Sequence, residues 1–280
     1  MLRVAVPNKG SLSESASTIL REAGYAQRSD AKQLTKLDPD NEVEFFYLRP
    51  RDIALYVGEG TLDVGITGRD LLLDSGAKAE EALQLGFGRS KFRFAAVPGT
   101  AKSEGDLAGK RIATSYDGVV ERFLQERGID ATVVRLDGAV ETSIQLGVAD
   151  VIADVVETGS TLRAAGLEVF GDIILESEAV MITRAGAEPT GLEVFTRRLQ
   201  GVLVARSYVM MDYDIRAERV EEAVALTPGI ESPTVSPLHR EGWVAVRSMV
   251  PRDQAQRVMD ALYDIGARGI LTTDIHACRL

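Results

Sequence analysis

The stretch DVVETGSTL, residues 154–162, gathers polar groups that could bind an anion. An apolar run leads into it, and the helical pattern STLRAAG leads away from it. A strand that turns into a helix through Gly, Ser and Thr presents free backbone N–H groups and hydroxyl donors, and both favour a bound anion. The alternative is an ordinary helix N-cap, with Thr158 or Ser160 as the capping residue and Gly159 easing the turn.

Two carboxylates flank these donors. Asp154 lies at the end of a predicted buried strand, and Glu157 lies inside the loop. Beside a phosphate, such groups could accept hydrogen bonds from ribose hydroxyls or approach a Mg²⁺ ion through water. Without a phosphate, Glu157 is only a solvated loop charge.

Composition narrows the function classes. The net charge of −10 argues against non-specific binding of nucleic acid, but it allows an anionic small molecule held locally. With one cysteine, Cys278, the chain cannot form an intrachain disulfide. The N-terminus enters a short strand without a signal-peptide pattern, and no long apolar run follows. We therefore expect a cytoplasmic protein with no membrane span and no nucleic-acid partner.

The elements that must position these groups alternate between short β-branched strands and amphipathic helices, which indicates an α/β fold. With 280 residues, the chain is long enough for about two or three domains. The first set of strands and helices consists of residues 1–90 together with residues 184–207, and the second set consists of residues 91–183. Two lobes with a cleft between them follow as the simplest arrangement, with ligands at the carboxyl ends of the strands.

The last part of the chain has a different order. From residue 208 to residue 280 the pattern is strand, helix, strand, strand, helix, strand, which is the ferredoxin-like βαββαβ order. We predict a separate C-terminal domain there.

The stretch from Glu141 to Leu162 resembles ATP phosphoribosyltransferase, the family that opens histidine biosynthesis. The family pattern is matched without a gap by Glu141, Gly147, Ala149, Ile152, Asp154, Val155, Thr158, Gly159, Thr161 and Leu162. LRVAVPNKGSLSE, FFYLRPRDIALYVGEGTLDVGITGRDLL and QLGFGRSKFRFA resemble the first lobe of the same family, and TPGIESPTVSPL and GILTTDI resemble its C-terminal regulatory domain. The resemblance covers essentially the whole chain and points to the long form, which does not depend on a separate regulatory subunit.

The resemblance implies a two-lobed core like that of periplasmic binding proteins, followed by a regulatory domain. It also implies a reaction between ATP and 5-phosphoribosyl 1-diphosphate (PRPP) with Mg²⁺ as cofactor. Adenine N1 carries a lone pair already, so the reaction needs alignment of two anions and stabilisation of the departing pyrophosphate more than it needs a histidine base.

The same resemblance assigns roles to residues. The catalytic candidates are Lys9, Arg49 and Asp154. The PRPP-binding candidates are Asp154, Val155, Val156, Glu157, Thr158, Gly159, Ser160 and Thr161, with Asp154 on the ribose and Thr158 to Thr161 on the phosphate. The nucleotide-binding candidates are Gly68, Asp70, Ser90 and Tyr116. For each cation the alternative is a plain surface charge, and for Tyr116 it is plain packing.

In the C-terminal domain, the resemblance implies that L-histidine binds and inhibits. The candidates are Asp214, Glu231, Ser232, Thr234 and Gly269; exposed loop polarity is the alternative for this set. Dimers that assemble into hexamers are the implied oligomer.

Two other functions remain open from the residues. A non-catalytic small-molecule sensor would also use a two-lobed cleft and a ferredoxin-like tail. A phosphoribosyltransferase acting on another base would keep the phosphate loop. The ATP enzyme is favoured because a sensor would not require a phosphate loop with this long spacing; the enzyme for another base is the weaker option.

Overall fold

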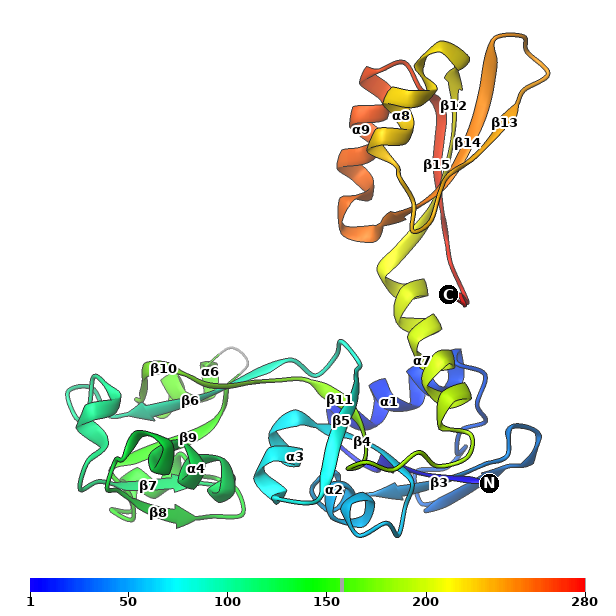
Figure 1. Ribbon diagram of the computed structural model, residues 1–280. Coiled ribbons are helices and arrows are strands. Elements are labelled where there is room, and N and C mark those ends of the chain that lie inside the picture. The colour runs from blue at the N-terminus through cyan, green and yellow to red at the C-terminus, as the bar shows by residue number, and fades with distance from the viewer. Residues whose placement is uncertain (157–158, 280) are drawn as a thin grey trace. The chain divides into compact units, whose positions relative to one another are not determined.

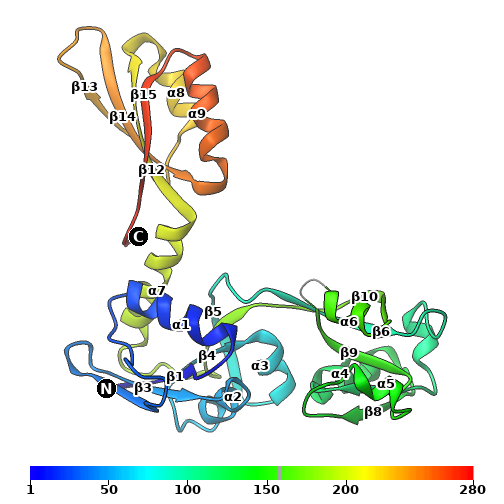
Figure 2. The same ribbon diagram turned by 180° about the vertical axis from the view of Figure 1, so that it is seen from behind.

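The structure, a computed structural model, describes residues 1–156 and 159–279. Its internal contacts divide the chain into two compact units. The first contains Met1–Thr18 and Tyr25–Leu192, and the second contains Ile19–Gly24 and the residues from Glu193 onward (Figures 1 and 2).

The first unit holds two sheets. The first sheet has six strands in the order β2-β3-β1-β4-β11-β5. Its strands are β1 (Leu2–Pro7), β2 (Thr35–Asp38), β3 (Val43–Leu48), β4 (Val64–Gly68), β5 (Ala79–Gln84) and β11 (Ala179–Arg184). The helices that follow its strands are α1 (Ser11–Glu22), the 3₁₀ turn η1 (Pro39–Asn41), α2 (Pro50–Gly58) and α3 (Arg69–Ser75). Strand β1 pairs in parallel with β3 and β4, so the carboxyl ends of these three strands reach the same edge.

The close approach of α2 to this sheet depends on a glycine. All five residues of β4, VGITG, are buried, as befits a central strand. A Cβ added at Gly65 would lie 2.5 Å from Ile53 Cγ2, 3.0 Å from Val57 Cγ2 and 3.2 Å from Ile182 Cγ1. Gly65 therefore lets the α2 side chains pack directly on the strand.

The second sheet has five strands in the order β10-β6-β9-β7-β8. Its strands are β6 (Ser90–Ala96), β7 (Arg111–Thr114), β8 (Thr132–Arg135), β9 (Val151–Val156) and β10 (Glu168–Ser177). Its helices are η2 (Glu104–Leu107), α4 (Asp117–Arg127), α5 (Thr142–Gln145) and α6 (Ser160–Ala164). Because β7 is parallel to both β8 and β9, the loops after these strands also share one edge. Its core is aromatic: the Phe94 ring packs edge-on against Phe123 and stacks on Phe170.

Two chain crossings join the sheets, from β5 to β6 and from β10 to β11. The crossings are hydrogen-bonded to each other: Leu85 N–H donates to Ala179 O (2.9 Å), and Ala179 N–H donates to Phe87 O (2.8 Å). Glu178, the residue between β10 and β11, forms ion pairs with Arg69 and Arg89. The two lobes are thus connected by two chain segments that are hydrogen-bonded to each other and stabilised by the ion pairs of Glu178.

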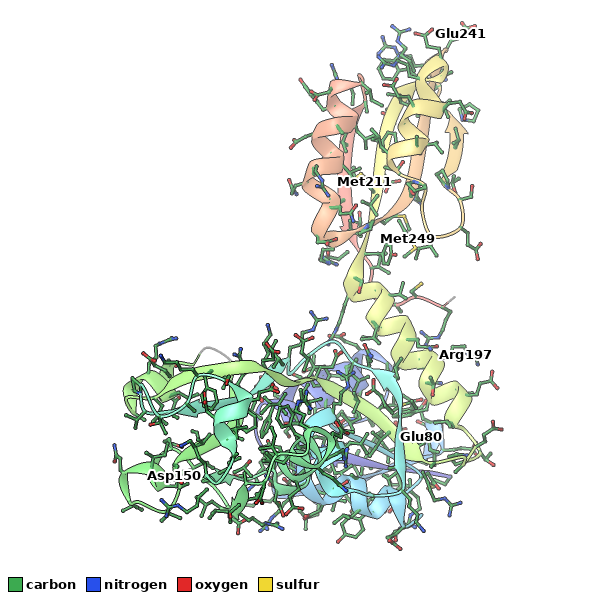
Figure 3. All side chains as sticks on the ribbon, turned by 60° about the vertical axis from the view of Figure 1, so that its left-hand side comes forward. Glu80, Asp150, Arg197, Met211, Glu241 and Met249 are labelled. Carbon is green, nitrogen blue, oxygen red and sulfur yellow. The ribbon has the colours of Figure 1, made fainter. Side chains whose placement is uncertain are left out.

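Besides Ile19–Gly24, the second unit contains α7 (Leu192–Ser207) from Glu193 onward and a four-stranded antiparallel sheet in the order β13-β14-β12-β15. Its elements are β12 (Tyr208–Arg216), η3 (Ala217–Arg219), α8 (Val220–Leu226), β13 (Thr234–Pro237), β14 (Trp243–Pro251), η4 (Arg252–Gln254), α9 (Ala255–Asp264) and β15 (Arg268–Asp274). Alternate residues of β12 are buried, and Met211 lies in the core formed with α8 and α9 (Figure 3). Strand order and element order confirm the ferredoxin-like prediction. Arg206 of α7 forms an ion pair with Glu22 (2.7 Å), so α7 packs with the chain segment Ile19–Gly24.

Several local expectations were incomplete. Strands β2 and β5 were not predicted, because TKLD has a single β-branched residue, AEEALQ has none, and neither contains an aromatic residue. Helices were expected around residues 139–147 and after residue 159, but α5 and α6 have only 4 and 5 residues. No helix in the described ranges is long and apolar enough to cross a membrane.

Candidate active site

The sequence-predicted site residues of the first unit gather at the carboxyl ends of parallel strands. Lys9 follows β1, Arg49 follows β3, and Gly68 ends β4. In the second lobe, Tyr116 follows β7 and Asp154 lies near the end of β9. This is the edge at which α/β sheets hold ligands.

A cavity of about 360 Å³ lies at the end of β9. It is lined by Glu141, Asp154, Val155, Val156, Gly159, Ser160, Thr161 and Leu162. Gly159 has φ +69°, the left-handed conformation that glycine adopts without strain, and α6 begins at the next residue. Six of the eight predicted PRPP residues therefore share one cavity with backbone N–H and hydroxyl donors. The other two, Glu157 and Thr158, lie outside the described residues.

Asp154 is placed where its charge is disfavoured. Burial raises the pKa of its carboxyl, and the nearby carboxylates of Glu141 and Asp70 raise the pKa further. The N–H of Val155, which donates to Asp154 Oδ1 at 2.7 Å, and the guanidinium of Arg51 act in the opposite direction. Among the described residues this partly buried carboxylate accepts the Val155 N–H, and it retains acceptor capacity that a ligand's hydroxyls can use.

The predicted nucleotide residues Asp70 and Tyr116 lie close enough for the Asp70 carboxylate to act on the Tyr116 hydroxyl. Ser177 Oγ accepts from the N–H of Asp70 and donates to Asp70 Oδ1, both at 3.0 Å. Burial and, next, the charge of Asp70 raise the pKa of the Tyr116 hydroxyl, so it stays protonated and can donate. Gly68 is buried directly against the Asp70 carboxylate, where a Cβ would collide with Oδ1.

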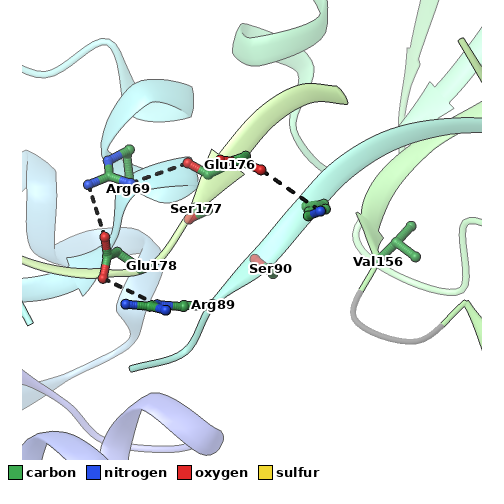
Figure 4. A pocket seen from close by; sticks show the side chains of 8 residues that line it. Arg69, Arg89, Ser90, Val156, Glu176, Ser177 and Glu178 are labelled. Atoms are coloured by element: carbon green, nitrogen blue, oxygen red, sulfur yellow. Dashed lines mark hydrogen bonds and ion pairs between the residues drawn. The ribbon is translucent and has the colours of Figure 1, made fainter. Parts of the chain in front are cut away.

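Ser90 lies apart from this pair, in a cavity of about 480 Å³ at the double crossing (Figure 4). The cavity is lined by Arg69, Arg89, Ser90, Lys91, Val156, Glu176, Ser177 and Glu178. Val156 lines both this cavity and the one at the end of β9, so the two cavities adjoin. The structure thus brings Ser90 close to the predicted phosphate loop through β9.

Lys9 and Arg49 are both exposed. Their strands are in parallel register, with Pro7 opposite Leu48, so the two cations lie at adjacent strand ends. Neither lines a cavity described above. At these positions the two cations could pair with a negatively charged group of a bound ligand.

Two further residues of this region were not proposed from sequence. Glu141, identified only as part of the family pattern, lines the β9 cavity opposite the loop donors. Arg51, in the first turn of α2, lies with its guanidinium carbon 4.8 Å from the centre of the Tyr116 ring. Arg51 could have been proposed from the sequence because it directly follows Pro50 at the predicted start of a helix.

Protein side chains alone do not make a metal centre in the described part of the chain, where no three His, Cys, Asp or Glu side chains come together suitably. A Mg²⁺ ion that arrives with a diphosphate needs only one or two protein carboxylates. Asp154 and Glu141 in one cavity fit that requirement.

In the C-terminal unit, a cavity of about 390 Å³ brings together three of the predicted histidine-binding residues, Glu231, Ser232 and Thr234. Its remaining lining residues are Met210, Ile230, Arg247, Ser248, Met249, Cys278 and Arg279. Asp214 and Gly269 do not line it. They adjoin each other on β12 and β15, where a Cβ at Gly269 would lie 3.6 Å from Asp214 Oδ2. The five residues therefore occupy two separate places in this unit.

Comparison with known proteins gives consistent results. The model of the family ATP phosphoribosyltransferase matches residues 49–201, and the model of its C-terminal domain matches residues 205–277. The chain is 68% identical over 285 residues to the ATP phosphoribosyltransferase of Streptomyces avermitilis, and 67% identical over 284 residues to that of Pseudarthrobacter chlorophenolicus, with both chains covered in full in each case.

Among solved structures, the ATP phosphoribosyl transferase (HisG:HisZ) complex from Thermotoga maritima includes a similar chain. The TM-score is 0.62 at 29% identity, and the match covers 71% of this chain and 97% of the other. The expected architecture, a core with two α/β sheets followed by a ferredoxin-like domain, is confirmed. The chain is an enzyme of the glycosyltransferase type and belongs to the ATP phosphoribosyltransferase family, in the long form that carries its own C-terminal domain.

Proposed function

We propose that the chain joins ATP to PRPP, giving N1-(5-phosphoribosyl)-ATP and pyrophosphate, as the first step of L-histidine biosynthesis. The lone pair of adenine N1 forms the new bond to the anomeric carbon, and the electron pair of the broken C–O bond leaves with pyrophosphate. The observation that carries the proposal is the β9 cavity, which combines Asp154 and Glu141 with the donors of Gly159, Ser160 and Thr161.

In this reaction the loop holds the ribose 5-phosphate. Asp154 accepts from the ribose hydroxyls, and the backbone and hydroxyl groups from Gly159 to Thr161 donate to the phosphate. Thr158 shares this role by family resemblance. Lys9 and Arg49, at adjacent strand ends, neutralise the pyrophosphate as it departs.

The family needs a divalent metal, and we propose that it is Mg²⁺ bound mainly by the diphosphate of PRPP. Asp154 and Glu141 would hold it from the protein side. When bound, it would reduce the negative charge on the leaving group.

The adenine is placed by the nucleotide residues. Tyr116, packed on Phe92 at one side, offers its ring to the base, and Asp70 offers a carboxylate fixed by Ser177. Gly68 gives room for that carboxylate, and Ser90 donates from the adjoining cavity.

For regulation, we propose that the domain of residues 208–280 binds L-histidine and inhibits the core formed by residues 1–90 with 184–207 and residues 91–183. The cavity at Glu231, Ser232 and Thr234 supplies polar groups beside apolar walls from Ile230 and Met249, which suits a small amino acid. Asp214 and Gly269 extend the site along the sheet. Homodimers that assemble into hexamers in the cytoplasm, without a separate regulatory subunit, complete the proposal.

An omission assay tests the proposed activity. Purified protein with ATP, PRPP and Mg²⁺ should release pyrophosphate and form a product with altered ultraviolet absorbance, and leaving out any one component should stop both. A sensor without catalytic activity would bind a small molecule and release no pyrophosphate, which would reject the proposal.

A further inference from the structure

Helix α3 of the first lobe contacts the second lobe near both of its ends. Asp70 and Asp74 are four residues apart, so their side chains lie on one face of the helix. Asp70 accepts a hydrogen bond from Ser177 of β10, and its charge acts on the Tyr116 hydroxyl. Asp74, at the other end, has no role in the activity proposed above.

The carboxylate of Asp74 is inserted at the start of α4. Its Oδ1 accepts from Gly118 N–H (3.0 Å) and from Val119 N–H (3.4 Å), both in the first turn of that helix. These N–H groups have no acceptor within their own helix, and a negative charge there is favoured by the helix dipole. Gly118 permits the approach, because a Cβ at that position would collide with the main-chain oxygen of Asp74.

The other oxygen of Asp74 holds a cation. Asp74 Oδ2 forms an ion pair with Arg51 at 3.0 Å, and the Asp74 side chain is only 9% exposed. The same guanidinium lies over the Tyr116 ring, 4.8 Å from its centre. Burial raises the pKa of the Asp74 carboxyl, while the two N–H donors and Arg51 counteract this effect and Asp117 adds to it. One carboxylate thus orients both the helix that follows Tyr116 and the cation that stacks on its ring.

We propose that Asp74 is a positioning residue for the nucleotide pocket: it anchors α4 of the second lobe to α3 of the first and, through Arg51, fixes the Tyr116 ring against which adenine packs. The inference rests on the proposed function, because it takes Tyr116 as the adenine contact. Loss of Asp74 should therefore weaken ATP binding because the Tyr116 ring is no longer held in place.

The test is a double-mutant cycle on ATP affinity measured by calorimetry in the full-length protein. Asp74→Asn removes the charge that holds Arg51 but keeps the side-chain shape, and should weaken ATP binding about tenfold. In a Tyr116→Ala background the same substitution should change ATP affinity less than twofold, because the ring that Asp74 positions is gone. Arg51→Met, which removes the pair from the other side, should reproduce the effect of Asp74→Asn and guards against a variant that fails to fold.

The matched control is Asp117→Asn. Asp117 is in the first turn of the same helix, but it forms an ion pair with Arg135 of its own lobe (3.5 Å), so ATP affinity should stay within twofold. Equal losses from Asp74→Asn with and without Tyr116, or an ATP affinity unchanged in Asp74→Asn and Arg51→Met, would overturn the inference. If the unaltered protein binds ATP but these variants show no coupling, only this inference fails; if it binds no ATP, the proposed function fails with it.

Discussion

Replacing Asp154 with Asn should lower activity without lowering stability. If Asp154 accepts from the ribose hydroxyls, loss of its charge removes a charge-assisted hydrogen bond that is worth about 1.5–3 kcal/mol. This corresponds to a decrease of roughly 10- to 150-fold in kcat/KM for PRPP. Steady-state kinetics with PRPP as the varied substrate measure it.

The stability of the Asp154→Asn variant should not fall together with its activity. The folded-state pKa of Asp154 is raised above its ordinary value of 3.8, so the folded protein binds this proton more tightly than the unfolded chain does. Folding therefore loses stability as pH rises from 3.8 through the raised pKa. At neutral pH, Asp154→Asn removes this disfavoured charge, and the melting temperature should stay the same or increase.

Asp150, just before the same strand, is the matched control. Arg111 pairs with it at 2.8 Å and lowers the pKa of its carboxyl to about 2. Its stabilising contribution is present above 3.8 and is lost as pH falls through about 2. Since both side chains are more than a third exposed, Asp150→Asn should cost only about 0.2–1 kcal/mol and leave kcat/KM unchanged. Unchanged PRPP kinetics in Asp154→Asn, or a loss of stability larger than that of Asp150→Asn, would refute the reasoning.

Three further changes test other parts of the account. Gly65→Ala places a methyl against Ile53, Val57 and Ile182 and should cost about 1–3 kcal/mol in urea unfolding, whereas Gly105→Ala, whose nearest atom lies at 3.7 Å, should cost less than that; equal costs would contradict the packing argument. Lys9→Met should reduce kcat/KM for PRPP about tenfold or more, while Lys36→Met on β2 should not, and equal kinetics in both would remove Lys9 from the site. Thr234→Val should raise the histidine concentration for half-inhibition roughly three- to tenfold at unchanged kcat, while Ser236→Ala on the same strand should leave inhibition intact; inhibition that persists in both would place histidine elsewhere.

The sequence was sufficient for the architecture because its signals were local. The apolar runs of β1, β3 and β9 and the βαββαβ order of the C-terminal domain all depend on patterns within a few residues. Strand β5 was missed because AEEALQ owes its strand conformation to pairing with β11, a segment about 100 residues later in the chain.

In the candidate site, too, residues close in sequence could be predicted, whereas residues brought together by tertiary packing could not. The donors around Gly159 are consecutive, so their spacing identified them. The partners of Asp70 and Tyr116 could not be found from spacing, because Ser177 and Arg51 are far from them in sequence and reach them only through the packing of the two lobes. The resemblance grouped Asp214 and Gly269 with Glu231, Ser232 and Thr234, but the structure places these two against each other on β12 and β15, outside the lining of that cavity.

The central claim is that adenine N1 of ATP receives the phosphoribosyl group from PRPP. The most direct measurement uses ATP labelled with ¹⁵N at N1, together with PRPP and Mg²⁺, and follows the product by NMR and the release of pyrophosphate. The account predicts one pyrophosphate for each product molecule and a coupling between the labelled nitrogen and the anomeric carbon. A product joined at another nitrogen, a preference for a different base, or pyrophosphate without a phosphoribosyl-ATP product would contradict it.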